Sequence, residues 1–281
     1  MDIYVLIPVF NRLHCTKKLI KCLREQTLKE NLKIYVVDDG SKDGTRDWLN
    51  KQFDINIVQG NGKLFWSGAI NLGLRNIFKN SNPDDWLLLI NNDVLIESDY
   101  VETLFNIAKK NYPAAIGSII KNKNGEIVSV GPKINTKSLE IKDLNDFKKI
   151  FKHKKLLKDV DALSGRGVIY PLKSIVEVNG INQRIFPHYF ADYELSLRIK
   201  KKGYNLMLSK DAYVLSDEDF DLIKHQRKIQ PFFSKLSSKK SPSLIYSKFF
   251  FWWEASNNME KITLPLRIIL FIILPVLRKV L

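Results

Sequence analysis

Short apolar, β-branched runs alternate with helical patterns over the first 120 residues, and this alternation constrains the fold more than any other feature. The first run, Ile3–Val9, is followed at 15–26 by apolar side chains at helical spacing. Further expected strands lie at 34–37, 55–58, 86–90 and 115–120, and further expected helices at 43–50, 68–80 and 98–110. This βαβα order predicts an α/β fold with a doubly wound, mostly parallel sheet.

Polar or glycine-rich sequence follows four consecutive expected strands, at 8–12, 38–41, 60–62 and 91–93. In doubly wound sheets, ligands bind outside the carboxyl ends of the strands. The sequence therefore predicts one shared cleft at this edge of the sheet.

The second half of the chain is less regular. A hairpin turn is expected at 122–125, because Asn and Gly favour tight turns there. An apolar segment follows at 162–170, and a helix is expected at 191–202, ended by Gly203.

The composition excludes several classes of protein. With 45% hydrophobic and 11% aromatic residues, the 281-residue chain can bury a large core, which excludes a disordered protein. Cys15 and Cys22 would lie about 10 Å apart on the expected helix, beyond the roughly 7 Å limit for a disulfide. The absence of a disulfide framework agrees with a reducing compartment. The first apolar run breaks at Pro8 and has no basic residues before it, so we expect no signal peptide.

The formal charge of +15 is distributed unevenly. Residues 133–158 contain nine Lys and three acids, in a segment expected to be an exposed loop or a short helix. Residues 217–281 contain eleven bases and six acids. Such basic segments suit a phosphate-bearing partner, nucleic acid or an anionic membrane, although a solvated lysine-rich face explains them equally well.

Two acids stand where chemistry is expected. Asp93 follows the most apolar strand, and a carboxylate there can hold Mg or Mn, which prefer oxygen ligands; the alternative is an ordinary polar turn. Asp192 lies in the first turn of the expected helix, where it can act as a general base or simply as a helix-start acid. Glu194 and Arg198 are four residues apart and can form an ion pair.

Four motifs in register resemble the family 2 glycosyltransferases of the GT-A fold. They are IPVFNR at 7–12, VVDDGSKDGT at 36–45, LLLINND at 87–93 and HYFADYELSLRIKKKGY at 188–204. The resemblance covers about residues 1–215. The segments GNGKLFWSGAIN at 60–71 and LSGRG at 163–167 are closer to the rhamnosyltransferase-like branch of surface polysaccharide enzymes.

The resemblance implies a role for each matching residue. Asp93 would bind a divalent cation, Mn or Mg, on the donor diphosphate, and Asp192 would be the catalytic base. Asp39 would contact the nucleotide base. The remaining nucleotide or donor-binding residues would be Pro8, Asn11, Arg12, Gly62, Trp66, Ser67, Gly68, Asn71, Asn92 and Arg166, and His188 and Glu194 would lie on the acceptor side.

The motifs also depart from the family pattern. The metal motif reads Asn-Asn-Asp, so one acid is missing, and Ala191 stands where the family usually has Glu. A third metal ligand is open between Asp217, His225 and neither.

The expected function is therefore inverting transfer of a sugar from a dTDP- or UDP-sugar to a glycan or polyprenyl-linked acceptor in cell-surface polysaccharide synthesis, with rhamnose as the first choice of donor sugar. A catalytically inactive scaffold of the same fold is one alternative. A basic nucleic-acid-binding protein is the other, but it leaves the acids at the strand ends unexplained.

The C-terminal part is expected to form a separate unit. Residues 1–216 would be the GT-A domain, and 217–281 a basic, aromatic and amphipathic extension facing the membrane. The apolar run at 268–277 is far shorter than the roughly 20 residues needed to span a bilayer, so an interfacial helix is expected, helped by the aromatic residues at 249–253. The alternative is a helix packed on the domain. The membrane-facing hypothesis places the protein in the cytoplasm, peripherally at the inner face of the cell membrane.

Overall fold

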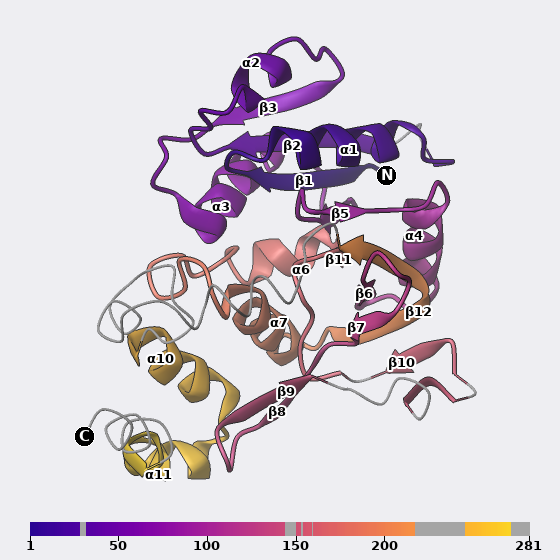
Figure 1. The fold of residues 1–281 in the computed structure, drawn as a ribbon. Helices are drawn as coiled ribbons and strands as arrows, with labels where there is room; N and C mark the ends of the chain where they lie inside the picture. Colours follow the sequence, from indigo (N-terminus) through magenta and orange to yellow (C-terminus); the bar gives the residue numbers. More distant parts are fainter. Residues whose placement is uncertain (29–31, 144–149, 153, 159, 217–244, 271–281) are drawn as a thin grey trace.

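The computed structural model describes residues 1–28, 32–143, 150–152, 154–158, 160–216 and 245–270 (Figure 1). The elements run, in chain order, β1 (Ile3–Val9), α1 (Leu13–Arg24), β2 (Leu32–Asp38), α2 (Thr45–Leu49), β3 (Ile55–Gln59), α3 (Phe65–Ile77), β4 (Trp86–Leu89), β5 (Val94–Leu95), α4 (Tyr100–Lys110), β6 (Ala114–Lys121), β7 (Ile127–Ser129), β8 (Pro132–Asn135), β9 (Glu140–Asp143), β10 (Leu156–Lys158), β11 (Val168–Pro171), α6 (Leu172–Glu177), α7 (Ala191–Lys201), β12 (Asn205–Ser216), α10 (Ile245–Ala255) and α11 (Asn258–Ile268).

The described strands form one mixed sheet and one small hairpin. The sheet order is β10-β12-β6-β11-β4-β1-β2-β3, with β5 added to β12 and β7 added to β6. The half from β4 to β3 is parallel, whereas β11 runs antiparallel to both β4 and β6. The expected α/β fold with a mostly parallel sheet is confirmed. The carboxyl ends of β1, β2, β3 and β4 therefore meet at one edge.

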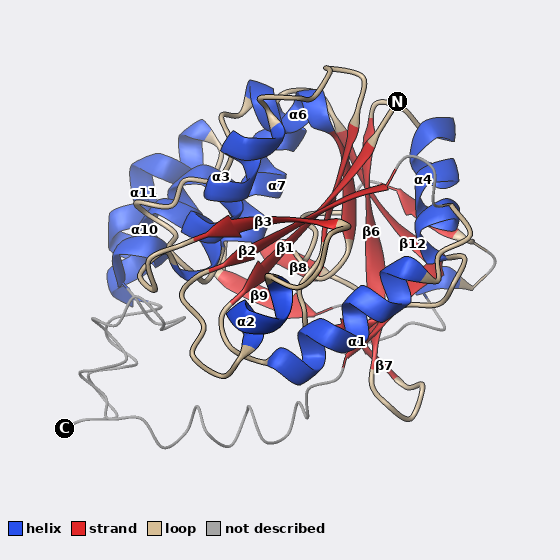
Figure 2. Ribbon diagram, turned by 90° about the horizontal axis from the view of Figure 1, so that it is seen from above, coloured by secondary structure: helices blue, strands red, loops and turns tan. Residues whose placement is uncertain are grey.

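The alternation of side chains along β1 explains why helices cover both faces of the sheet (Figure 2). Ile3, Val5 and Ile7 pack with apolar residues of α1, α2 and α4. Tyr4 and Leu6 point to the other face and pack with α3, α6 and α7. Because both faces are buried, the central strands read as continuous apolar runs.

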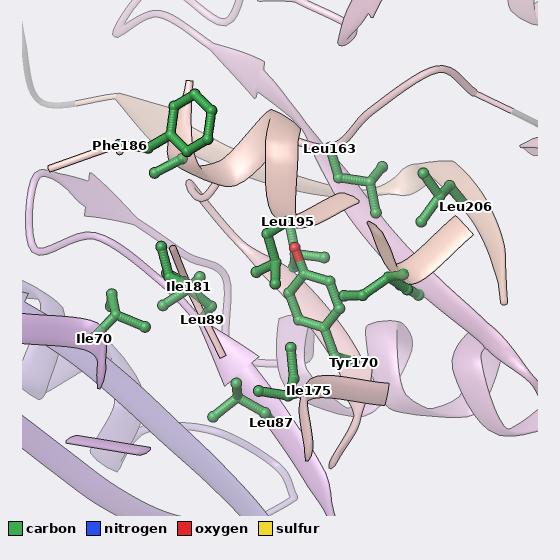
Figure 3. Packing of buried hydrophobic residues seen from close by; sticks show 14 of the residues in the cluster. Ile70, Leu87, Leu89, Leu163, Tyr170, Ile175, Ile181, Phe186, Leu195 and Leu206 are labelled. Atoms are coloured by element: carbon green, nitrogen blue, oxygen red, sulfur yellow. The ribbon is translucent and has the colours of Figure 1, made fainter. Parts of the chain in front are cut away.

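The second of these cores is built around Tyr170 of β11. Figure 3 shows Leu87 and Leu89 of β4, Ile175 of α6 and Leu195 of α7 packed around its ring. This packing fixes α7, the helix that carries Asp192, against the sheet.

Several expected boundaries were displaced. The helix expected at 15–26 spans Leu13–Arg24, and the one expected at 68–80 spans Phe65–Ile77. Neither helix has a side-chain hydrogen bond at its N-cap, so the usual sequence signal for a helix start was absent.

The basic segment 133–158 was expected to be a loop or a short helix, and this prediction was wrong for most of its described part. It contains the β8–β9 hairpin and the strand β10. The two hairpin strands pair with each other, and Ile134 and Ile141 face one another in that pairing.

The described C-terminal residues form two helices that pack on the domain. In α10, Phe251 and Trp252 are buried, and in α11, Leu264 and Ile268 are buried. All four belong to the core that also contains α7. Most of the apolar run at 268–277 lies outside the described residues. No helix in the described ranges is long and apolar enough to cross a membrane.

Candidate active site

The loops after β1 and β2 are joined by hydrogen bonds. Asn11 donates its backbone N–H to Ser41 Oγ at 2.7 Å, and its Oδ1 accepts from the backbone N–H of Lys42 at 2.9 Å. Asn11 and Arg12 both have positive φ, which turns the chain sharply from β1 into α1. Pro8 lies within β1, buried and opposite Val37 of β2.

Asp39 organises the loop that leads into α3. Its Oδ1 accepts the backbone N–H of Gly62 at 2.8 Å, and its Oδ2 accepts those of Leu64 and Phe65 at 2.9 and 3.2 Å. The side chain is almost fully buried. Gly60 has to be glycine here, because a Cβ would lie 2.7 Å from Asp39 Oδ1. The predicted contact of Asp39 with a nucleotide base stays a prediction.

The first turns of α3 lie beside the loops that follow β4 and precede β11. Trp66 donates its indole N–H to Asn91 Oδ1 at 2.9 Å. Its ring also lies so close to Gly165 that a Cβ there would come within 2.6 Å of it. Ser67 is buried and donates its hydroxyl to the carbonyl of Phe186. Gly68 is also buried, and an added Cβ would lie 3.1 Å from the Leu64 side chain.

Asp93 lies in the short loop between β4 and β5 and is enclosed by two arginines. Its Oδ2 accepts from Arg12 Nη1 at 3.1 Å and from Arg166 Nη2 at 3.5 Å. Its Oδ1 is buried and has no hydrogen-bond partner among the described residues. The neighbouring Asn92 donates to Thr16 Oγ1 on α1 at 3.0 Å, which holds the loop in place. An unpaired buried carboxylate oxygen is costly unless a ligand satisfies it.

That oxygen fits one ligand position of a hard cation, because Mg and Mn prefer carboxylate oxygens. The described residues contain no group of three or more His, Cys, Asp or Glu side chains placed to hold a metal ion. A cation here would therefore take most of its other ligands from a bound diphosphate and water. Asp217 and His225, the other candidate ligands, lie outside the described residues.

Asp192 is held by two backbone groups at the start of α7. Its Oδ2 accepts the N–H of Gly165 at 2.9 Å, and its Oδ1 accepts that of Tyr193 at 2.9 Å. Burial raises the pKa of Asp192, while these two hydrogen bonds and the charge of Arg166 oppose the shift. The carboxylate is thus fixed in direction and more basic than an exposed one.

The segment around Gly165 connects Asp93 and Asp192. Arg166 contacts Asp93, and the residue before it binds Asp192. Ser196 of α7 fixes the same segment, because its hydroxyl accepts from the backbone N–H of Leu163 at 3.0 Å. The sequence reasoning did not single out Ser196, although it lies one helical turn after Asp192 and faces the same way.

Glu194 is buried in an ion pair with Arg198, at 2.6 Å between Oε1 and Nε. Arg198 also donates to the carbonyl oxygens of Val178 and Gly180. This geometry confirms the ion pair that the four-residue spacing predicts. The ion pair explains why Glu194 is buried, and its predicted place on the glycan-acceptor side stays a prediction. His188 is exposed, with its ring edge-on to that of Tyr189. Its acceptor-side role stays a prediction.

Asn71 anchors the segment before α7 rather than pointing at the acids. Its Nδ2 donates to the carbonyl of Ile181 at 2.7 Å, and its Oδ1 accepts the N–H of the same residue at 2.9 Å. It lines a groove of about 530 Å³ between α3 and residues 178–184, together with Arg75 and Arg184. None of the three acids lines this groove.

The described C-terminal residues support α7 from outside. Phe251 of α10 packs on Phe190, the N-cap residue of α7, with ring centroids 5.0 Å apart. Ser247 donates its hydroxyl to the carbonyl of Ile185 at 2.6 Å. The helix that carries Asp192 is therefore packed against a segment that the sequence predicts to be a separate extension.

Comparison with known proteins agrees with this architecture. The chain is 36% identical over 109 residues to the glycosyltransferase GlyA of Streptococcus pneumoniae, a match that covers 37% of this chain and 14% of GlyA. The chain thus spans only a small part of that relative.

Solved structures of low sequence identity share the fold. The mannosyltransferase PcManGT of Pyrobaculum calidifontis, solved with GDP-Man and Mn²⁺, superposes with a TM-score of 0.58 at 16% identity, covering 95% of this chain and 74% of that one. S. aureus TarS 1-349, solved with UDP-GlcNAc, gives 0.56 at 14%, covering 96% and 73%. The fold is thus the GT-A-like fold of these glycosyltransferase structures.

The model of glycosyl transferase family 2 matches residues 4–165. That range is more than half of the chain and extends from β1 to Gly165, so it includes the loops that carry Asp39 and Asp93. The chain belongs to glycosyl transferase family 2.

Proposed function

We propose that this protein transfers a sugar from a nucleotide-sugar donor to a glycan or polyprenyl-linked acceptor, with inversion at the anomeric carbon. The observation that carries the proposal is the segment 165–166. Gly165 donates its backbone N–H to Asp192, and Arg166 contacts Asp93. The proposed base, Asp192, is therefore connected through two adjacent residues to the proposed diphosphate-binding residues.

Asp93, Arg12 and Arg166 would receive the donor diphosphate. A divalent cation on Asp93 Oδ1 would offset the negative charge that builds on the leaving nucleoside diphosphate. The two guanidinium groups can donate to its oxygens, because arginine binds phosphate through several N–H groups at once. Mn is the first choice of cation, since Mn²⁺ was present with GDP-Man in PcManGT, and Mg is the second.

Asp192 would take the proton of the attacking acceptor hydroxyl. Its carboxylate is held by the N–H groups of Gly165 and Tyr193, so it needs no reorganisation before the reaction. A raised pKa suits this role, because a base with a pKa closer to the working pH accepts a proton more readily. Attack from the face opposite the diphosphate inverts the anomeric configuration.

The donor nucleotide is proposed from two sources. TarS was solved with UDP-GlcNAc and PcManGT with GDP-Man, so both nucleotides occur on this fold. The resemblance of the segments 60–71 and 163–167 to rhamnosyltransferase-like enzymes favours a dTDP- or UDP-sugar and a rhamnosyl donor. Assembly of a cell-surface polysaccharide is the corresponding process.

The test is nucleotide release from a panel of dTDP-, UDP- and GDP-sugars, with Mn, Mg or a chelator, in the presence of lipid-linked and free glycan acceptors. We expect turnover with one donor, and an anomeric configuration in the product opposite to that of the donor by NMR. Retention of configuration would contradict the inverting mechanism.

An inactive scaffold is the second candidate, and one observation favours it. The motif at 91–93 reads Asn-Asn-Asp, so it supplies one carboxylate where the family motif has two acids. Nucleotide binding without turnover for every donor and acceptor would support this candidate and reject the first.

A further inference from the structure

The outer face of α11 is unusual for a protein surface. Met259, Ile262, Leu266, Ile269 and Leu270 are 76, 75, 60, 46 and 46% exposed. At about 100° per residue, Met259, Ile262 and Leu266 fall within an arc of about 60° on one side of α11, and Ile269 and Leu270 lie in the turn that directly follows this helix. Clusters of exposed apolar side chains mark a surface that binds another apolar surface.

The opposite side of the same helix is fixed to the domain. Leu264 and Ile268 are buried in the core shared with α7. Glu260 accepts from the hydroxyl of Thr136 at 2.8 Å, and Arg267 donates to the carbonyl of that residue. The apolar face is therefore presented outward on a helix that cannot roll inward to hide it.

The same contacts bring a basic segment to the edge of this face. Thr136 lies in the turn between β8 and β9, and this hairpin reaches α11 (Figure 1). The exposed Lys133, Lys137 and Lys142 belong to the hairpin. Lys133 pairs with Asp161 and Lys142 with Glu140, but exposed pairs of this kind are weak, so their ammonium groups can still contact phosphates. On α11 itself, Lys261 lies over the ring of Trp253, 5.4 Å from its centroid. Lysines next to apolar and aromatic side chains are typical of helices that lie in a membrane interface.

The chain that follows continues this chemistry. Residues 271–281 read FIILPVLRKVL, with no acid and with two bases near the end. In sequence, the apolar face is thus followed by a segment that is itself both apolar and basic.

We infer that the outer face of α11, defined by Met259, Ile262, Leu266, Ile269 and Leu270, docks on an anionic lipid bilayer. Its apolar side chains would enter the acyl boundary while the hairpin lysines meet lipid phosphates. A second copy of the chain fits less well, because the lysines around one face would then meet those around the other. A bilayer offers opposite charge.

Docking of α11 on a bilayer would also place the membrane close to the helix that carries Asp192. α11 follows α10, which packs on the N-cap residue of α7. A protein held at the cytoplasmic surface in this way would meet a lipid-linked acceptor near Asp192, and only this last consequence rests on the proposed function.

The experiment is co-sedimentation of the full chain with phosphatidylcholine vesicles, with and without phosphatidylglycerol. No nucleotide or acceptor is added, so the outcome is independent of glycosyl transfer. We expect the anionic vesicles to bind at least about tenfold more tightly than the neutral ones. The double variant Ile262→Glu/Leu266→Glu should lose at least about tenfold of that binding.

Phe53→Glu is the matched control, because Phe53 is also an exposed apolar side chain but lies in the loop between α2 and β3. It should bind as the unmodified protein does. Thermal unfolding and light scattering of each variant identify misfolding and self-association. Vesicle binding unchanged in the folded double variant would overturn the inference, and so would a dimer that the same substitutions dissociate.

Discussion

Two buried aspartates follow the parallel strands on either side of β1, at the same edge of the sheet, yet their surroundings differ. Asp39, after β2, accepts three backbone N–H groups from the loop that leads into α3. Asp93, after β4, faces two arginine side chains and keeps one oxygen without a partner in the described structure. A carboxylate whose oxygens all accept backbone N–H groups stabilises the fold. A carboxylate with one oxygen that accepts no hydrogen bond is available to a ligand.

Asp192 falls between these two cases, since it accepts two backbone N–H groups and still lies close to Arg166, which contacts Asp93.

The largest expected effect concerns Asp192. Asp192→Asn removes the base and should lower kcat by about 10²- to 10⁴-fold. Steady-state kinetics with the active donor checks this, with nucleotide affinity as the control. A variant that keeps its kcat would remove Asp192 from the reaction.

Asp39→Ala should have the next largest effect, and on stability. Three backbone N–H groups would lose their acceptor, the buried Asp39 carboxylate, and at about 1 kcal/mol for each hydrogen bond we expect the free energy of unfolding to fall by about 3 kcal/mol. Urea denaturation followed by circular dichroism measures this change.

Asp93→Ala is the matched variant for that comparison. Because its Oδ1 has no partner among the described residues and its arginine partners are partly exposed, the free energy of unfolding should change by no more than about 1 kcal/mol. Equal destabilisation by the two substitutions would mean that the two aspartates do not differ in role.

For nucleotide binding, in contrast to stability, we expect substitution of Asp93 to have a larger effect than substitution of Asp39. Asp93→Asn keeps the size of the side chain but removes the charge that attracts a cation. We expect about tenfold weaker nucleotide binding in the presence of Mn, and little change in chelator. Calorimetric titration with the nucleotide of the active donor provides the measurement. If Mn does not strengthen nucleotide binding even in the unmodified protein, the arginines alone neutralise the diphosphate.

The sequence could predict this edge of the sheet because its signals are local. Apolar runs mark β2 and β4, and each acid lies in the loop that follows its strand, so the sequence predicts Asp39 and Asp93 together. Which of the two would be saturated was not visible, since the N–H groups that Asp39 binds come from Gly62–Phe65, more than twenty residues away.

Helix starts were missed for a similar reason. α1 begins after Arg12, which has a positive φ, and α3 begins after Leu64, and neither residue has a side chain that caps a helix by hydrogen bonding. In such cases the start is set by tertiary contacts, here the packing of each helix against the sheet.

The structure of the C-terminal helices also depends on contacts with segments that are distant in sequence, which local sequence patterns do not indicate. The aromatic cluster at 249–253 suggested a membrane surface, but Phe251 and Trp252 fill the space beside α7. The β8–β9 hairpin was hidden by its lysines, because its strands are held by pairing with each other and by contacts between Thr136 and α11. Composition indicates that a segment is apolar or basic, and only the fold indicates which side faces out.

The smallest expected effect is on the pH dependence, and it tests the intermediate character of Asp192. Burial raises its pKa, so the carboxylate loses its charge at a higher pH than an exposed aspartate, whose pKa is about 3.9. The acid limb of the kcat/KM profile should therefore lie above that value.

The pH dependence of stability should have the opposite sign to that of an aspartate whose pKa is lowered by folding. Because the folded pKa exceeds the unfolded one, this group's contribution to the free energy of unfolding is largest below the unfolded pKa and is lost as the pH rises through the folded pKa. Asp192→Asn removes that pH-dependent term, so the variant should lose less stability than the unmodified protein as the pH rises through this window. Urea denaturation at a series of pH values measures the difference, and identical pH dependence in the two proteins would show that the carboxylate is no more basic in the fold than outside it.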